Sequence, residues 1–178
     1  MRSGDAVIVT GEMIASDPID DFESWFRGLA APGYQLAYAM LHDSSAAEDA
    51  VQEAALRAWR GFKSLDRTRP ALPWFLTIVA NCCRSGWRRN RRGAIPLTEA
   101  LSSRRDESSA AVQREDLRKA MLRLNQDDRL IVALHFYLDL PLAEVAQIAG
   151  LKLPTLKTRL YRAVKTLRPA VEYEDGLQ

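Results

Sequence analysis

The stretch LPLAEVAQIAGLKLPTLKTRLYRAVKTLR, residues 140–168, predicts two short helices joined by a tight turn. Apolar residues recur at helical spacing in both parts, and each part opens near a proline, which the first helical turn tolerates. Gly150 stands between them and supplies the backbone freedom that a tight turn needs. We expect helices over about Pro141–Ala149 and Pro154–Arg168, which together form a helix-turn-helix.

The second of these helices is predicted to bury one side and to present a basic face on the other. Its inward residues are Leu156, Leu160, Ala163, Val164 and Leu167, and those of the first helix are Leu142, Val145, Ala146 and Ala149. At about 100° per residue, the outer side carries Thr158, Tyr161, Arg162 and Lys165, with Lys157 and Arg168 at its edge. Such side chains read guanine edges and hold phosphates, so this face fits the major groove of DNA. A solvated basic helix in an ordinary bundle is the alternative.

The stretch PWFLTIVANCCRSGWRRNRR, residues 73–92, predicts a longer helix with an arginine-rich outer side. Its expected inward residues are Trp74, Phe75, Ile78 and Cys82, and its outer residues are Thr77, Asn81, Arg84, Arg88 and Arg91. Cations hold phosphates, whereas amide and aromatic side chains hold unstacked bases, so this mixture favours single-stranded or melting DNA. A solvated arginine helix is the alternative, with Trp74 as an anchor of the core.

The stretch AAEDAVQEAALRAWRGF, residues 46–62, predicts a helix that begins with a capping box formed by Ser45 and Glu48. Its expected core side carries Val51, Ala55, Ala58, Trp59 and Phe62, and the opposite side carries Asp49, Gln52, Glu53, Leu56 and Arg60. An acidic face with an exposed leucine suits a protein partner that is basic or amphipathic. A solvated face with a Glu53–Arg57 ion pair is the alternative.

The remaining chain completes an all-α pattern with two small helical domains. Further helices are expected from Asp20, over Pro32–Leu41, and around Leu117–Leu124 and Leu130–Leu134, whereas the proline-rich residues 64–73 predict a loop. The predicted organisation is an N-terminal tail over 1–19, a first domain over 20–92, a linker over 93–112, a second domain over 113–171 and a C-terminal tail over 172–178.

Charge is segregated along the chain, although the net charge of its 178 residues is only +2. Residues 16–53 carry eight acidic side chains against one arginine, and residues 54–92 carry ten basic side chains against one aspartate. Residues 152–168 carry six basic side chains and no acid. Two separate basic blocks favour a polyanion that is contacted twice, and the acidic first third favours a different partner.

Composition argues against several classes of protein. No apolar run approaches the roughly 18–20 residues of a membrane span, and the apolar stretch near the N-terminus is too short for a secretory signal. The adjacent Cys82 and Cys83 suit neither a disulfide framework nor a zinc site. No phosphate-binding glycine loop or nucleophile elbow is present. We therefore expect a cytoplasmic protein that has no metal or cofactor and is not an enzyme.

In their order, spacing and separation by a linker, residues 46–62, 73–92 and 140–168 resemble the extracytoplasmic-function (ECF) sigma factors of the bacterial sigma-70 family. The resemblance covers about Asp20 to Leu167. It implies two helical domains, sigma-2 and sigma-4, joined by a flexible linker, and a subunit that directs promoter-specific transcription initiation. The implied partners are the β′ clamp helices and β flap of core RNA polymerase, double-stranded and melted promoter DNA, and an anti-sigma protein.

The resemblance assigns residues to three interfaces by motif position. The contacts with core polymerase fall to Asp49, Gln52, Glu53 and Leu56. The contacts with the −10 element fall to Trp74, Asn81, Arg84, Arg88 and Arg91. The contacts with the −35 element fall to Thr155, Lys157, Thr158, Arg159, Tyr161 and Arg162. The chain departs from the common pattern at Pro141, at Pro154 and at Thr77, where relatives often carry arginine.

Three other functions stay open at this point. A helix-turn-helix regulator that acts without polymerase has no use for the acidic face around Asp49–Glu53. A sigma mimic that only sequesters an anti-sigma protein should lose its DNA-facing cations, which this chain keeps. An RNA-binding adaptor should prefer RNA to duplex promoter DNA of equal length.

Overall fold

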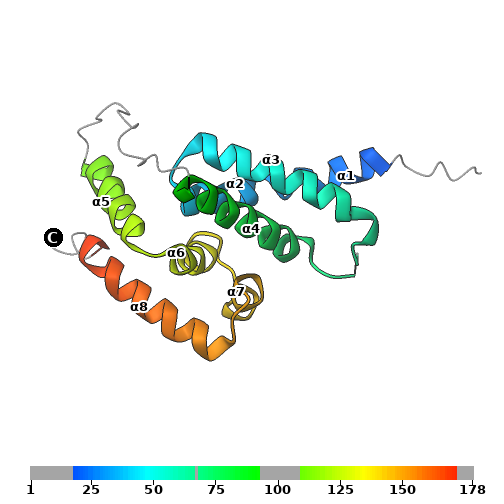
Figure 1. Cartoon of the computed structure of the whole chain (residues 1–178). Coiled ribbons are helices and arrows are strands. Elements are labelled where there is room, and N and C mark those ends of the chain that lie inside the picture. The colour runs from blue at the N-terminus through cyan, green and yellow to red at the C-terminus, as the bar shows by residue number, and fades with distance from the viewer. Residues whose placement is uncertain (1–17, 67, 93–108, 172–178) are drawn as a thin grey trace, which may run out of the picture.

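The structure, a computed structural model, describes residues 18–66, 68–92 and 109–171, which form helices joined by short turns (Figure 1). The first half contains α1 (Pro18–Arg27), α2 (Ala30–Leu41), α3 (Ser44–Gly61), the 3-10 turn η1 (Phe62–Ser64) and α4 (Ala71–Arg92). The second half contains α5 (Ser109–Arg123), α6 (Gln126–Val132), the π-helical turn η2 (Ala133–Tyr137), α7 (Leu142–Ala149) and α8 (Leu153–Val171). These ranges contain no strand, so the all-α prediction is confirmed.

The first half is a bundle in which α2, α3 and α4 pack against one another. Helices α2 and α4 approach closely because Gly33 has no side chain. A Cβ atom at this position would lie 2.6 Å from Cε1 of Phe75, and the Phe75 ring is fully buried with no room to move aside. Gly33 therefore sets how near these two helices can come.

The buried side of α3 differs from the predicted one. It is made of four small residues, Ala47, Ala50, Ala54 and Ala58. Of the larger residues expected there, Phe62 is buried, but Val51 is only half-buried and Trp59 is 37% exposed. The prediction followed the bulky side chains, whereas a stripe of alanines lets α3 pack close to its neighbours.

The predicted capping residue of α3 is wrong. The N-cap is Asp43, which has extended backbone angles and accepts a hydrogen bond from the Ala46 N–H at 2.7 Å. Ser45 and Glu48 both lie inside the helix, with exposed side chains. Aspartate and serine are comparable caps, so only the backbone conformation at Asp43 decides between them.

The predicted helix-turn-helix is confirmed as α7 and α8. Gly150 ends α7 with a left-handed φ of 69°, and its N–H donates to the Gln147 carbonyl at 3.2 Å. On α8 the buried residues are Leu156, Ala163 and Leu167. Val164, which was also predicted to face inward, is 38% exposed because it lies at the edge of the buried side. On α7, Ile148 joins the predicted Val145 and Ala146 in the core.

The two halves share one apolar core. Helix α6 and the turn η2 pack against α2, and α7 packs against α4, as Figure 1 shows for the helices at the centre of the molecule. A single cluster therefore joins Leu36 and Val79 of the first half to Leu130, Leu134 and Leu156 of the second. A smaller second cluster lies between α5 and α8.

Helix α5 begins at Ser109, inside the range that the sequence assigns to the linker. The rest of that range, residues 93–108, lies outside the described residues, as do both predicted tails apart from the start of α1. No helix in the described part of the chain is sufficiently long and apolar to span a membrane.

Candidate polymerase and promoter interfaces

The outer side of α3 is acidic and contains an exposed leucine. Asp49 and Gln52 are exposed, and Leu56 is 54% exposed, which leaves a large apolar side chain in solvent. Glu53 accepts a hydrogen bond from Nε of Arg57 at 2.7 Å, so this carboxylate is already held by an ion pair along the helix. Trp59, one turn beyond Leu56, adds apolar surface that the sequence interpretation had assigned to the core. We call the surface of Asp49, Gln52, Glu53 and Leu56 the α3 face.

Trp74 belongs to an aromatic cluster at the end of the first half where α1 lies. Its ring centre is 5.7 Å from that of Trp25, in an edge arrangement, and a Cβ atom on Gly61 would lie 3.3 Å from its Cζ2. The ring is half-buried, so Trp74 anchors the start of α4 while one part of it faces solvent. Phe75, which follows it, is fully buried. Both the anchoring role and a contact with an unstacked base are compatible with this position.

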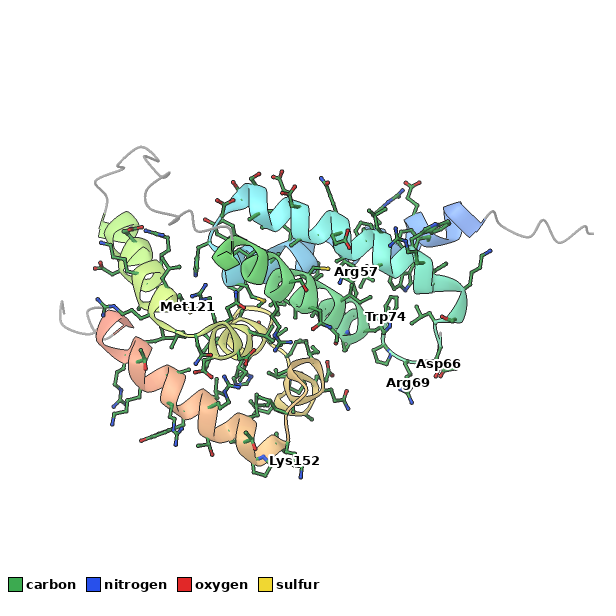
Figure 2. All side chains as sticks on the ribbon, in the orientation of Figure 1. Arg57, Asp66, Arg69, Trp74, Met121 and Lys152 are labelled. Atoms are coloured by element: carbon green, nitrogen blue, oxygen red, sulfur yellow. The ribbon has the colours of Figure 1, made fainter. Side chains whose placement is uncertain are left out.

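The loop before α4 projects from the bundle close to Trp74, and Figure 2 shows Asp66 and Arg69 at its outer end. The Asp66 carboxylate accepts hydrogen bonds from the Thr68 hydroxyl at 2.6 Å and from the Thr68 N–H at 3.0 Å. These bonds, more than the nearby Arg69, lower the pKa of Asp66. Asp66 and Thr68 are therefore held together although both side chains are exposed.

Asn81 and Arg84 lie next to each other on α4, and Arg84 is bound to the second half. Its Nη2 and Nε donate to the Asp127 carboxylate at 3.0 and 3.2 Å, and its Nη1 lies 3.4 Å from the Asn81 side-chain oxygen. Asn81 is exposed, whereas the Arg84 side chain is only 23% exposed. At Arg88 and Arg91 the structure describes the helical backbone but not the side chains.

The outer side of α8 presents residues that the helical pattern placed there, together with Thr155, which only the resemblance included. Thr155, Lys157, Thr158 and Arg162 are exposed, and Tyr161 is 73% exposed. The Thr158 hydroxyl donates to the Pro154 carbonyl at 3.1 Å, which holds this side chain against its own helix. These five residues and Arg159 make up the surface that we call the α8 face.

Arg159 differs from the rest of the α8 face because its guanidinium turns towards α6. It donates to Asp128 at 2.7 Å and to Asn125 at 3.2 Å, and it lies 3.5 Å from Asp127. Asn125 and Asp128 themselves cap α6 by reciprocal hydrogen bonds of 2.9 and 2.6 Å. The helical pattern alone left Arg159 off the outer side, and only the resemblance included it.

Arg129, a buried cation on α6, is a structural residue that the sequence interpretation missed. It is 7% exposed, and the hydrogen bonds of its guanidinium to other described residues all go to backbone carbonyls. Its guanidinium donates to the carbonyls of Met121, Leu122 and Leu124 at the end of α5 and to that of Met40 near the end of α2. Helix C-termini carry partial negative charge, which favours a nearby cation. Here the C-terminal ends of α5 and α2 both contact the Arg129 guanidinium. Burial lowers the pKa of Arg129 from its usual range.

Two family models match the chain in the order of the two halves. The first, Sigma-70 region 2, matches residues 21–93, and the second, Sigma-70 region 4, matches residues 114–167. The ECF RNA polymerase sigma factor SigL of Mycobacterium tuberculosis is 32% identical over 145 residues, which cover 78% of this chain and 82% of the relative. The chain belongs to the ECF sigma factors of the sigma-70 family. The α3 face and helix α4 thus lie in region 2, and the α8 face lies in region 4.

Other comparisons agree with this family and fold. The RNA polymerase sigma factor SigV of Bacillus subtilis is 28% identical over 142 residues, covering 80% of this chain and 86% of the relative. The sigma factor RpoE in complex with the anti-sigma factor NepR from Bartonella quintana shares the fold, with a TM-score of 0.72 and 24% identity over 86% of this chain and 98% of that one. CnrH in complex with the cytosolic domain of CnrY shares it with a TM-score of 0.66 and 19% identity, over 87% and 90% of the two chains.

Proposed function

We propose that this sigma factor binds core RNA polymerase through region 2 and directs it to promoters that regions 2 and 4 recognise together. One observation supports this most: the residues that match polymerase contacts and those that match −35 contacts are largely exposed, on different helices of one chain. One molecule can therefore hold polymerase with α3 and duplex DNA with α8. In this proposal the polymerase carries out RNA synthesis, and the chain supplies only the choice of start site.

The α3 face is the surface we assign to the β′ clamp helices of polymerase. Exposed carboxylate and amide groups around Leu56 suit a partner that offers cations beside an apolar groove. Leu56 is the side chain on this face with apolar area to bury, because it is 54% exposed in the free chain. The acidic groups set orientation and association rate, and Leu56 contributes to affinity.

The α8 face is the surface we assign to the −35 element. A helix buried along Leu156 and Ala163 stands with its opposite side free to enter the major groove. There Arg162 and Lys157 can pair with guanine edges, and the exposed Tyr161 can contact the backbone or a thymine methyl group. Lys152, which Figure 2 shows at the turn into α8, adds a cation for phosphate at the entry of this helix.

The start and outer side of α4 are the surface we assign to the melted −10 element. Asn81 offers an amide for a base edge, Arg84 and the arginines after it offer cations for phosphates, and Trp74 offers part of an aromatic ring for stacking. The loop that ends at Arg69 adjoins this surface. Region 2 would thereby hold one strand after the duplex opens.

Two further partners belong to the proposal. We assign the β flap of polymerase to region 4, as the family membership implies. The structure of RpoE that shares this fold holds an anti-sigma factor, and we extend the same class of inhibitor, an anti-sigma protein, to this chain.

The deciding experiment is run-off transcription with purified core polymerase and a library of promoter fragments. We expect the chain to redirect core polymerase to a defined subset of start sites that the core enzyme alone does not use. If a chain with verified helical content redirects polymerase to no start site, the proposal is wrong. If it binds promoter DNA specifically but never associates with core polymerase, a polymerase-independent regulator is the better function.

Two substitutions separate the roles of the halves. Leu56→Ala should weaken association with core polymerase about fivefold to thirtyfold, since it removes exposed apolar area that the partner would bury. Arg162→Ala should cost about 1–3 kcal/mol at the −35 element and leave association with polymerase intact. Lys119→Ala, which removes an exposed cation from α5, is the control and should change neither quantity. Loss of polymerase association in Arg162→Ala would contradict the assignment of α8.

A further inference from the structure

One carboxylate group joins the two DNA-binding surfaces of the chain. Asp127, at the start of α6, accepts from Arg84 of α4 at 3.0 Å and lies 3.5 Å from Arg159 of α8. Arg84 comes from region 2 and Arg159 from region 4. Asp128, the next residue, holds Arg159 from the other side at 2.7 Å.

The packing around Asp127 holds the halves in the same arrangement. Leu130 and Ile131, which follow it on α6, are fully buried in the core cluster that also contains Leu36 and Val79. Arg129 donates across the same boundary to the Met40 carbonyl. Among these contacts, however, the Arg84–Asp127 pair is only partly buried, because its side chains are 23% and 48% exposed. It is therefore the contact that salt and a competing phosphate can reach.

The closed arrangement cannot place both surfaces on two separate promoter elements at once. This step of the inference rests on the proposed function. The −10 and −35 elements are separate sites on one duplex, which lengthens by about 3.4 Å for each base pair between them. In the closed chain, a residue from each of the two surfaces contacts the same carboxylate. The sixteen residues from 93 to 108 that join α4 to α5 can reach about 55 Å when extended, so the covalent connection permits the separation that the shared carboxylate forbids.

We propose that Asp127 is an acidic latch that keeps the free sigma factor closed by occupying Arg84, so that the two DNA-binding surfaces engage a promoter together only after polymerase separates the halves. The carboxylate mimics a phosphate group: it gives Arg84 the partner that the DNA backbone supplies later. A partly exposed pair of this kind shifts the equilibrium between closed and open chains roughly twofold to fivefold. The apolar contacts supply the rest of the closing free energy.

The test measures the distance between the halves in the free, full-length chain. Ser45→Cys on α3 and Thr166→Cys on α8 are exposed positions for a donor and an acceptor dye. The native Cys82 and Cys83 are buried, and burial raises the pKa of Cys83 to about 12, so neither should compete for the dyes. Single-molecule energy transfer then counts closed and open chains at low and high salt.

The decisive variant is Asp127→Asn, which removes the charge but keeps the size of the side chain. Its matched control is Glu23→Gln, which removes one charge from an exposed ion pair on α1. We expect a closed majority in the unsubstituted chain, an open fraction that rises with salt, and about a twofold to fivefold larger open-to-closed ratio in Asp127→Asn with a weaker salt dependence. Glu23→Gln should behave like the unsubstituted chain.

A second readout uses core polymerase. Because polymerase binding is coupled to opening in this proposal, Asp127→Asn should bind core polymerase more tightly by the same factor by which its open-to-closed ratio rises. Either an open majority in the unsubstituted chain or an unchanged ratio in Asp127→Asn overturns the latch. The dye measurement uses neither polymerase nor DNA, so it decides the latch even where the run-off assay rejects the proposed function.

Discussion

At the scale of single residues, the burial of His42 makes the stability of the fold depend on pH. It ends α2 in a left-handed conformation, with φ at 53°, and its buried Nε2 has no hydrogen-bond partner among the described residues. Burial, and then the charges of Arg129 and Arg118, lower the pKa of His42 to about 4. The folded chain therefore favours the neutral ring, beside the cation that ties α2 to α5.

We expect mild acid to weaken the fold through His42. The pKa in the folded chain lies below the unfolded value of about 6.5, so the unfolded chain takes up its proton first as pH falls. The stabilisation by the neutral ring is complete above about pH 6.5 and is lost progressively down to about pH 4. After solvent screening it amounts to about 1–2 kcal/mol. Urea unfolding at about pH 7 and about pH 5 measures this loss.

The substitution His42→Asn tests the assignment, because asparagine tolerates a left-handed backbone and does not titrate. It should remove most of the difference in unfolding free energy between the two pH values. The chain's other histidine, His135, donates from Nδ1 to the Leu140 carbonyl at 3.0 Å, and His135→Asn should leave the difference unchanged. An equal pH dependence in His42→Asn and the unsubstituted chain would show that other groups cause it.

At the scale of helices, the start of α3 allows the contribution of an N-cap to the free energy of unfolding to be measured. Asp43→Ala should lower the free energy of unfolding by about 1 kcal/mol, because the Ala46 N–H loses its 2.7 Å acceptor. Ser45→Ala, which tests the residue that the sequence favoured, should change it by no more than about 0.3 kcal/mol, since alanine suits a helix interior. Chemical denaturation of both variants measures the two effects. A larger loss of unfolding free energy in Ser45→Ala than in Asp43→Ala would support the predicted capping box instead of the Asp43 cap.

At the scale of helices, the sequence predicted the elements themselves but not the contacts between distant ones. Periodicity predicted the main helices, the helix-turn-helix and its Gly150 turn, because these depend on neighbours within one or two turns. It misplaced the buried side of α3, because a stripe of alanines carries a weaker signal than Trp59. It also gave no indication that Arg84 meets Asp127, 43 residues away, or that Arg129 meets Met40, 89 residues away. Such pairs follow from how helices pack, which no local pattern encodes.

At the scale of the whole molecule, the shared core makes the two halves one unit of stability in the free chain. The sequence divided the chain into two domains, and the two family models match them separately. Yet one cluster of buried residues runs through both, from Leu36 and Phe75 to Leu134 and Val145. Packing between halves adds to the unfolding free energy of each, so the halves should unfold together.

The positions of the tryptophans give a direct test of this coupling. All four, Trp25, Trp59, Trp74 and Trp87, lie in the first half, so tryptophan fluorescence reports that half alone. Leu134→Ala changes only the second half, but it removes a fully buried side chain from the shared core and should cost about 2–4 kcal/mol. We therefore expect the fluorescence transition in urea to move to lower concentration together with the loss of helical circular dichroism. Leu117→Ala, a change of the same kind at a 43% exposed position of α5, should move neither. A fluorescence midpoint that stays fixed while part of the helical signal shifts would mean that region 2 is stable without region 4. In that case the closed arrangement would contribute little to the stability of the chain, and polymerase would have little to overcome in separating the halves.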